Sequence, residues 1–301
     1  MLYKIINVLF GTHQWKIIYR KKNNSNWIEF NQPKNLSRAD PFLIKEKGCF
    51  YVFFEEFFIE KGNGYLCCAT LDFKNEKLIN KKIILKKNYH LSFPFVFKEN
   101  NKFYLIPETS KEKRIDLYEF ISFPYKLKFV KTLLRGYKAA DSVLYKHENI
   151  WFLLTNIERT KNDLNSKDLS IFQSKSLLNG SFVQKHKNPV VSDIQFARNA
   201  GKIIFSDNIL FRVSQDCKKR YGHKVNLMKI KKLTENHYQE ILFRKIEPPN
   251  GYIAFHTYNV CDGVIIGDAK IVKKDIKTLF SNFLKLIFIC KKKLHEIFSF
   301  F

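Results

Sequence analysis

An internal repeat in the first half of the chain constrains the fold more than any other feature. Three segments share a small polar opening residue, an apolar strand, a short polar turn and a second apolar strand. When Asp40, Ser92 and Asp141 are aligned, the repeat steps are about 52 and 49 residues, within the length range of one β-propeller blade. The three segments are 39–56, 91–108 and 140–156.

Further short strands are predicted between these hairpins. Apolar β-branched and aromatic residues recur in segments 65–71, 115–131 and 170–172. Four short strands in roughly 50 residues are the make-up of a propeller blade. The predicted fold class is therefore all-β, with a five-bladed β-propeller over residues 1–270.

The last two repeats are weaker in the sequence. A fourth unit is predicted over 196–213, and a fifth is assembled from 225–229, 239–242 and 256–266. An early apolar strand at 15–19 is predicted to close the ring against the last blade.

The C-terminal segment has a different pattern. From about Asp275, apolar residues recur at helical spacing with lysines between them, which predicts an amphipathic helix assigned to 271–301. Two interpretations stay open for this helix: it packs on the propeller, or it contacts a membrane surface as a basic anchor.

The formal net charge of +25 comes from 53 lysines and arginines against 28 acids. Such a charge attracts nucleic acid, anionic lipid headgroups or phosphorylated sugars. The lysines are spread along the whole chain, however, and no nucleic-acid recognition motif is present. We therefore expect no specific nucleic-acid partner.

The six cysteines form no C-x-x-C pair, and their spacing matches neither a zinc site nor a small disulfide framework. We expect no metal or other cofactor and a cytoplasmic location, with peripheral contact at the inner face of the membrane as a further possibility. The N-terminal apolar run is too short for a signal peptide, and no run reaches the roughly 18 apolar residues of a membrane span.

Residues at the starts of the repeats are the first candidates for a site. In a propeller the first strands of the blades line a central funnel, so these positions converge although they lie far apart in sequence. Asp40, Ser92, Asp141 and Arg198 occupy them. An aspartate at such a point also caps a turn, so a structural role remains the alternative.

Acidic residues also end the second strands of two repeats, namely Glu55, Glu56 and Glu108. Glycosyl transfer uses two carboxyl groups across a sugar, and their separation decides the stereochemistry. The sequence gives no such separation, and an acid after an apolar strand is often its solvated end.

A third group of polar residues lies in the last two repeats. Arginine binds phosphate or carboxylate through two parallel hydrogen bonds, so this group predicts a carbohydrate or sugar-phosphate ligand. The alternative is an internal salt-bridge network, and His256 alone is more typical of a buried structural histidine. The group comprises Arg198, Arg212, Gln215, Asp216, Tyr221, His256 and Asp262.

The order of several short motifs resembles one known domain. It is similar to the N-terminal region of plant glucosamine inositolphosphorylceramide transferases, also found in bacterial proteins associated with surface polysaccharides, over roughly residues 13–268. The opening hairpin also resembles the five-bladed propellers of family 43 glycoside hydrolases. The motifs include Ala39-Asp40-Pro41-Phe42, Ser92-Phe93-Pro94, Ile106-Pro107-Glu108, Asp141-Ser142, Ala197-Arg198-Asn199-Ala200-Gly201 and Tyr221-Gly222.

The resemblance to family 43 implies a catalytic base in the first blade, a tuning aspartate in the second and a glutamic acid in the third. Here the corresponding residues are Asp40, Ser92 and Asp141, which departs from that pattern. The hypothesis is therefore that Asp40 acts as base or nucleophile, Asp141 tunes it, and Glu108 or Glu55 supplies the acid.

These inferences predict a carbohydrate-active protein of surface-glycan biosynthesis, with glycosyl transfer at the funnel. One alternative is a non-catalytic sugar-binding module, since the plant domain resembled here precedes a separate glycosyltransferase domain. Another is a family 43-like glycoside hydrolase. Whether the chain is an enzyme stays open at this point.

Overall fold

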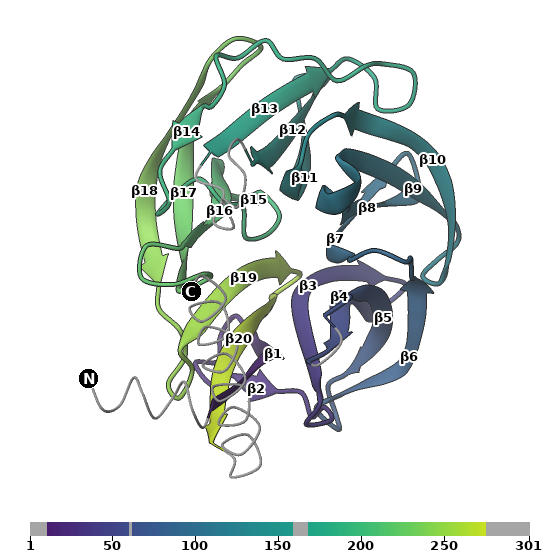
Figure 1. Ribbon diagram of the computed structural model, residues 1–301, viewed down its shortest axis with the longest axis vertical. Helices are drawn as coiled ribbons and strands as arrows, with labels where there is room; N and C mark the ends of the chain where they lie inside the picture. Colours follow the sequence, from purple (N-terminus) through teal and green to yellow (C-terminus); the bar gives the residue numbers. More distant parts are fainter. Residues whose placement is uncertain (1–10, 60–61, 159–167, 275–301) are drawn as a thin grey trace, which may run out of the picture.

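The computed structural model describes residues 11–59, 62–158 and 168–274. Within these ranges the chain forms five four-stranded sheets arranged as blades around a central axis (Figure 1). Neighbouring strands in each sheet are antiparallel. The predicted five-bladed propeller is confirmed.

Each blade is a meander of four strands. The first contains β3 (Leu36–Glu46), β4 (Cys49–Phe58), β5 (Tyr65–Asp72) and β6 (Lys77–Leu85), and the second contains β7 (Ser92–Glu99), β8 (Lys102–Glu108), β9 (Arg114–Ser122) and β10 (Lys126–Arg135). The third contains β11 (Ala139–His147), β12 (Ile150–Ile157), β13 (Asp168–Ser174) and β14 (Val191–Ser192). The fourth contains β15 (Ile204–Ser206), β16 (Ile209–Asp216), β17 (Lys224–Leu233) and β18 (Tyr238–Ile246), and a short 3₁₀ helix, η1 (Ser110–Glu112), follows β8.

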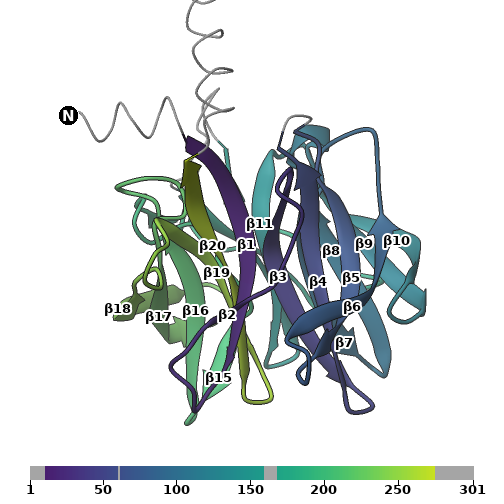
Figure 2. The same ribbon diagram turned by 90° about the horizontal axis from the view of Figure 1, so that it is seen from below.

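Both ends of the described chain build the fifth blade. It contains β19 (Ala254–Cys261), β20 (Val264–Lys274), β1 (Gly11–Lys21) and β2 (Ile28–Glu29). The pairing of β1 with β20 runs from Gly11 opposite Lys274 to Lys21 opposite Val264, and the two strands lie side by side in Figure 2. The prediction that strand 15–19 closes the ring is therefore confirmed.

The predicted content of the fifth blade was partly wrong. Segments 225–229 and 239–242 lie in β17 and β18, so they belong to the fourth blade. The first strand of that blade, β15, is only three residues long, which hides the hairpin pattern seen in the earlier repeats.

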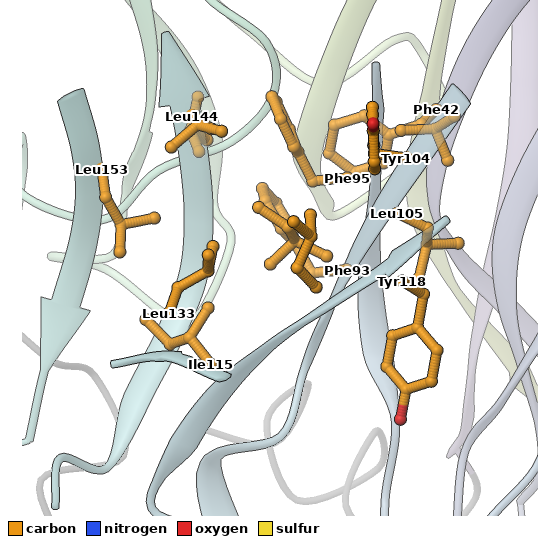
Figure 3. Close-up of a cluster of buried hydrophobic side chains, with 14 of the residues drawn as sticks. Phe42, Phe93, Phe95, Tyr104, Leu105, Ile115, Tyr118, Leu133, Leu144 and Leu153 are labelled. Carbon is orange, nitrogen blue, oxygen red and sulfur yellow. The ribbon is translucent and has the colours of Figure 1, made fainter. Parts of the chain in front are cut away.

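Phenylalanine-rich packing between the blades forms the core. One large cluster joins the first three blades and includes Phe42, Phe93 and Phe95 (Figure 3). The rings of Phe42 and Phe93 meet edge to face with centroids 4.9 Å apart, an arrangement that contributes about 1 kcal/mol beyond its area burial. The outer strands β6 and β18 are mostly exposed, and β10 is partly exposed.

Strand β20 continues to Lys274, into the range assigned to the predicted C-terminal helix. The rest of that prediction lies outside the described residues. Within the described ranges, the structure has no helix with the length and apolar character needed to cross a membrane.

Candidate functional site

A pocket of about 210 Å³ lies where the five blades converge. Its volume is below the roughly 300–1,000 Å³ of sites for drug-sized ligands, so it suits one sugar residue better than a length of glycan. Most of the predicted site residues line it, and the exceptions are Glu56, Arg212, Gln215, Asp216 and Asp262. The lining residues are Trp15, Ala39, Asp40, Glu55, Phe57, His90, Ser92, Glu108, Asp141, Arg198, Tyr221 and His256.

A repeated β-bulge brings Asp40 and Asp141 to this pocket. In each of β3, β7 and β11 the register with the next strand shifts near the start, and the first residue of the bulge has a positive φ. These residues are Asp40 (φ 52°), Phe93 (φ 43°) and Asp141 (φ 48°). A bulge re-aims a side chain at a sheet edge, which places both carboxyl groups in the funnel.

The bulges also correct the alignment of the second repeat. The structural counterpart of Asp40 is Phe93, whereas Ser92 corresponds to Ala39. Ser92 lines the pocket, but the second blade carries no acid at the bulge. The residues paired with these positions, Glu55 and Glu108, are equivalent to each other at the ends of β4 and β8.

Asp40 belongs to a charged network with His256 and Asp268. His256 lies between the two aspartates, with Nε2 at 3.2 Å from Asp40 Oδ1 and Nδ1 at 2.6 Å from Asp268 Oδ1. The backbone N–H groups of Asp40 and Phe93 donate to Asp268 and Asp40, respectively. Burial alone would raise the pKa of Asp40, but the hydrogen bond and charge of His256 lower it overall.

The two aspartates have the opposite effect on the imidazole. Although burial opposes the charge, Asp268 and Asp40 raise the pKa of His256 to about 10. His256 is therefore a buried imidazolium at neutral pH, and Asp40 is an ionised carboxylate.

A second network holds Asp141. Arg198 Nε donates to Asp141 Oδ2 at 2.6 Å, and Gln215 Nε2 donates to the same oxygen at 3.2 Å. The backbone N–H of Asp141 in turn donates to Glu108 Oε2 at 3.0 Å. Asp141 thus connects Arg198 with Glu108. Gln215 does not line the pocket, but its hydrogen bond helps to hold the Asp141 carboxylate in place.

Glu55 is the least compensated acid of the pocket. Burial, followed by the charges of Asp40 and Glu108, raises its pKa well above the usual range. Its Oε1 atom accepts no hydrogen bond, and Nε2 of His90, a histidine whose own pKa is lowered by burial, lies 3.2 Å away. Burial also raises the pKa of Glu108, but the charge of Arg198 and the Asp141 N–H oppose that rise.

Aromatic rings form one wall. Trp15 stacks on His256 with ring centroids 4.1 Å apart, and Tyr221 meets the same imidazole edge-on at 5.4 Å. The guanidinium of Arg198 lies 4.9 Å from the centre of the Tyr221 ring. Aromatic faces beside polar groups suit a sugar ring, which has apolar C–H faces and polar edges.

Gly222 fixes the position of Tyr221 beside the imidazole. Its φ is +59°, and a Cβ atom there would lie 2.4 Å from Cβ of His256. Its carbonyl also accepts the N–H of Phe255 at 2.9 Å. Only glycine allows the Tyr221 loop to approach the fifth blade this closely.

Arg212, Asp216 and Asp262 lie away from the pocket, and Asp262 is an exposed residue that pairs with Lys45. Arg212 is fully buried in an ion pair with Glu240 and donates to the carbonyls of Phe196 and Ala197. Asp216 is buried and accepts the N–H of Lys218 in a turn. Arg212 and Asp216 therefore make internal structural contacts, which the sequence analysis gave as the alternative to ligand binding.

Sequence reasoning missed Trp15, Phe57 and His90 in the lining and Asp268 behind it. Asp268 had a usable signal, because a single acid in the apolar run 264–269 is unusual unless it is paired. Trp15 was recognised only as part of the closing strand.

Asp40, His256 and Asp268 also form a group that could be considered for a metal, since one ligand atom from each lies within 4.8 Å of the others. Both ring nitrogens of His256 face these carboxylates, Nδ1 at 2.6 Å from Asp268 Oδ1 and Nε2 at 3.2 Å from Asp40 Oδ1. The expectation of no metal stays a prediction.

The fold is similar to solved glycoside hydrolases. The TM-score is 0.56 with an exo-β-1,3-galactanase from Clostridium thermocellum, at 12% identity over 80% of this chain and 65% of that chain. It is also 0.56 with a family 117 glycoside hydrolase from Zobellia galactanivorans, at 11% identity over 88% and 91% of the two chains. An α-L-arabinanase from Cellvibrio cellulosa, complexed with arabinohexaose, gives 0.54 at 11% identity over 75% and 88%. These similarities show the fold alone.

Sequence comparison is more specific. Glucosamine inositolphosphorylceramide transferase 1 from Oryza sativa subsp. japonica is 33% identical over 205 residues, which are 67% of this chain and 27% of that protein. The Arabidopsis thaliana protein of the same name is 32% identical over 67% of this chain and 26% of its own length. The chain thus matches about a quarter of the length of these relatives. The family model described as glucosamine inositolphosphorylceramide transferase 1, N-terminal, matches residues 23–253, and the chain therefore belongs to that family.

Proposed function

We propose that the pocket binds one sugar residue of a glycan and catalyses glycosyl transfer, with Asp40 as base or nucleophile and Glu55 as acid. One observation carries the proposal: two carboxyl groups of the same pocket have environments that favour opposite protonation states. Pairs of acids whose pKa values are pushed apart are the arrangement that divides acid and base roles in glycosyl chemistry.

Each of the two acids has the surroundings that its role requires. The hydrogen bonds from His256 and from the Phe93 N–H keep Asp40 ionised and fix its orientation. Glu55 is buried, and its Oε1 accepts no hydrogen bond, so a protonated Glu55 is available to donate to the leaving oxygen.

The structure favours Glu55 over Glu108 as the acid. Glu108 Oε2 already accepts the backbone N–H of Asp141, and the nearby Arg198 stabilises its ionised form. Glu108 and Asp141 then act as positioning residues that hold Arg198 against the pocket. Arg198 and Tyr221 would contact the hydroxyl groups and one face of the bound sugar.

The relatives favour transfer over hydrolysis. They are named as transferases, whereas the fold neighbours are named as a galactanase, an arabinanase and a family 117 hydrolase. The same acid and base serve both reactions, and the acceptor is either water or a glycan hydroxyl. We place the reaction in the synthesis of surface glycans.

A second candidate is a sugar-binding module without catalysis. It is favoured by the length of the relatives, since most of each relative lies outside the match and has room for a separate catalytic domain. In that case the pocket would present a glycan to another active site.

A screen of glycans and nucleotide sugars on wild type, Asp40→Asn and Glu55→Gln tests the proposal, followed by turnover assays of every ligand that binds. Glycosyl transfer predicts turnover that both substitutions reduce by at least 100-fold while sugar binding persists. Glu148→Gln, in an exposed turn, serves as a control and should retain full activity. Binding without turnover would favour the sugar-binding module, and no sugar binding at all would refute both candidates.

A further inference from the structure

A group of basic side chains continues outward from the aromatic wall of the pocket. Trp15 and Lys270 are directly opposite each other on β1 and β20, so their side chains lie on the same face of the fifth blade. The Lys270 ammonium lies 5.3 Å from the centre of the Trp15 ring. His13, two residues before Trp15 on β1, lies on that face as well and is exposed.

A third basic residue comes from the fourth blade. Arg220 is exposed and immediately precedes Tyr221, whose ring meets the Trp15 ring edge-on with centroids 6.4 Å apart. Gly222 holds this loop against His256, so Arg220 projects from a fixed loop end. We name His13, Arg220 and Lys270 the cationic rim.

The three residues influence one another electrostatically. Partial burial, followed by the charges of Lys270 and Arg220, lowers the pKa of His13, which still reaches solvent. Burial and the charge of Arg220 likewise lower the pKa of Lys270. Among the described residues, no carboxylate forms an ion pair with any member of the rim. His13 is therefore uncharged at neutral pH, and the like charges of Arg220 and Lys270 repel each other, which an anionic ligand would relieve.

The cationic side chains inside the pocket, in contrast, already have carboxylate partners. Arg198 is paired with Asp141, and His256 lies between Asp40 and Asp268. The pocket itself is rich in carboxyl groups, so a phosphate or carboxylate entering it would be repelled. An anionic group carried by the bound sugar would have to lie outside the pocket, beside Trp15 and Tyr221, where the rim is.

We infer that the cationic rim binds an anionic group, a phosphate or a carboxylate, on the sugar whose ring occupies the pocket. The inference rests on the proposed sugar binding and adds the substrate class: charged sugars over neutral ones. Arg220 can form two parallel hydrogen bonds with such a group, and Lys270 supplies a point charge next to the aromatic wall.

The test compares a neutral hexose, the corresponding hexose phosphates and the corresponding hexuronic acid by titration calorimetry at low salt. The anionic sugars should bind wild type about tenfold more tightly than the neutral hexose. The double variant Arg220→Gln with Lys270→Gln should remove that preference and leave neutral-sugar affinity nearly unchanged. Phosphates and hexuronate are tested separately because either group could be the natural one.

Three controls make the result specific. Lys128→Gln with Lys245→Gln removes the same charge from the exposed strands β10 and β18 and should preserve the preference. Lys270→Arg keeps the charge and should also preserve it. Inorganic phosphate alone should perturb the NMR signals of the Arg220 loop in wild type and not in the double variant at the rim.

The outcomes separate the two proposals. If the neutral hexose binds and the anionic sugars bind no better, the rim inference is wrong while the proposed function stands. An equal loss of preference in the β10/β18 control would also overturn the inference, because total charge would explain it. If neither neutral nor charged sugars bind, the proposed function fails, and a lack of phosphate-induced NMR changes at the rim then refutes the rim as well.

Discussion

Nε2 of His256 lies 3.2 Å from Oδ1 of Asp40, although the two residues come from the fifth and first blades. The contact exists because the chain closes its ring at this point, with β19 and β3 as neighbouring inner strands. Asp268, on the next strand of the fifth blade, holds the other nitrogen of the imidazole. Closure of the fold and the charge state of the candidate base are therefore linked.

The first prediction concerns the pH dependence of stability. The pKa of His256 is raised from 6.5 to about 10 in the folded protein, so the native state binds more protons than the unfolded chain between these values. Its contribution to the free energy of unfolding is complete below about pH 6.5 and is lost as the pH rises through about 10. Denaturant titrations at pH 6.5, 8 and 10 should show wild type losing its advantage over His256→Gln, by a few kcal/mol in total.

His90→Gln provides the matched control for that experiment. Burial lowers the pKa of His90, so its contribution to stability increases as the pH rises toward 6.5 and is nearly constant from there to pH 10, whereas that of His256 falls over the same range. If the difference between wild type and His256→Gln were constant from pH 6.5 to 10, His256 would not be the imidazolium described above.

The second prediction is that Glu55→Gln stabilises the folded protein at neutral pH. The pKa of Glu55 is raised well above 4.5, so this residue costs stability as the pH rises above that unfolded value. A glutamine is neutral at all pH values and has nearly the same shape, so the unfolding free energy at pH 7 should increase by about 1 kcal/mol or more. Denaturant titration at pH 7 measures the change.

The neighbouring residue gives the contrast. Glu56 is buried, but Lys81 and Arg38 bind it and lower its pKa. Glu56→Gln breaks these pairs and should destabilise the protein by roughly 3–5 kcal/mol. Similar losses in both variants would contradict the view that Glu55 is an uncompensated acid.

The third prediction concerns the Tyr221 loop. Gly222→Ala would place a methyl group 2.4 Å from Cβ of His256 at a φ of +59°, so the loop must move away from the fifth blade. Gly136→Ala has a similar φ of +87° but meets no atom within 4 Å, so it isolates the backbone strain. Gly222→Ala should cost about 1–3 kcal/mol more than Gly136→Ala and weaken sugar binding. Thermal unfolding and calorimetry would show this, and equal effects of the two variants would refute the steric argument.

How far the sequence predicts this protein differs between the fold and the site. The first three blades are visible as repeats because each begins with a full hairpin whose strands share an apolar stretch. The fourth blade begins with a three-residue strand, so its hairpin at 196–213 is weaker in the sequence, and the fifth is assembled from both ends of the chain, so no local pattern describes it.

The site shows the same division. Asp40, Glu55 and Asp141 could be predicted because they lie at the starts or strand ends of the repeats. The bulges that direct Asp40 and Asp141 into the pocket depend on strand register, which the sequence does not give. The same bulge puts Phe93 where alignment by polarity had placed Ser92. The sequence also does not predict which acid an arginine pairs with. Arg198 pairs with Asp141 in the pocket, whereas Arg212 pairs with Glu240 away from it.

The last prediction follows from the fate of Arg212. Its guanidinium is fully buried and binds both carboxylate oxygens of Glu240, at 2.8 Å and 2.5 Å, as well as the carbonyl of Ala197. Arg212→Met leaves Glu240 as a buried charge without this partner and should reduce the unfolding free energy by about 3–5 kcal/mol. Arg212→Met with Glu240→Met removes both charges and should recover part of that loss, because a buried ion pair can often be replaced by apolar side chains at little cost. Denaturant titration of the three variants, with Glu240→Met as the other single change, gives the coupling energy.

The sugar affinity of the folded double variant should equal that of wild type. A selective loss of binding would instead place Arg212 in the ligand site, as the sequence first suggested.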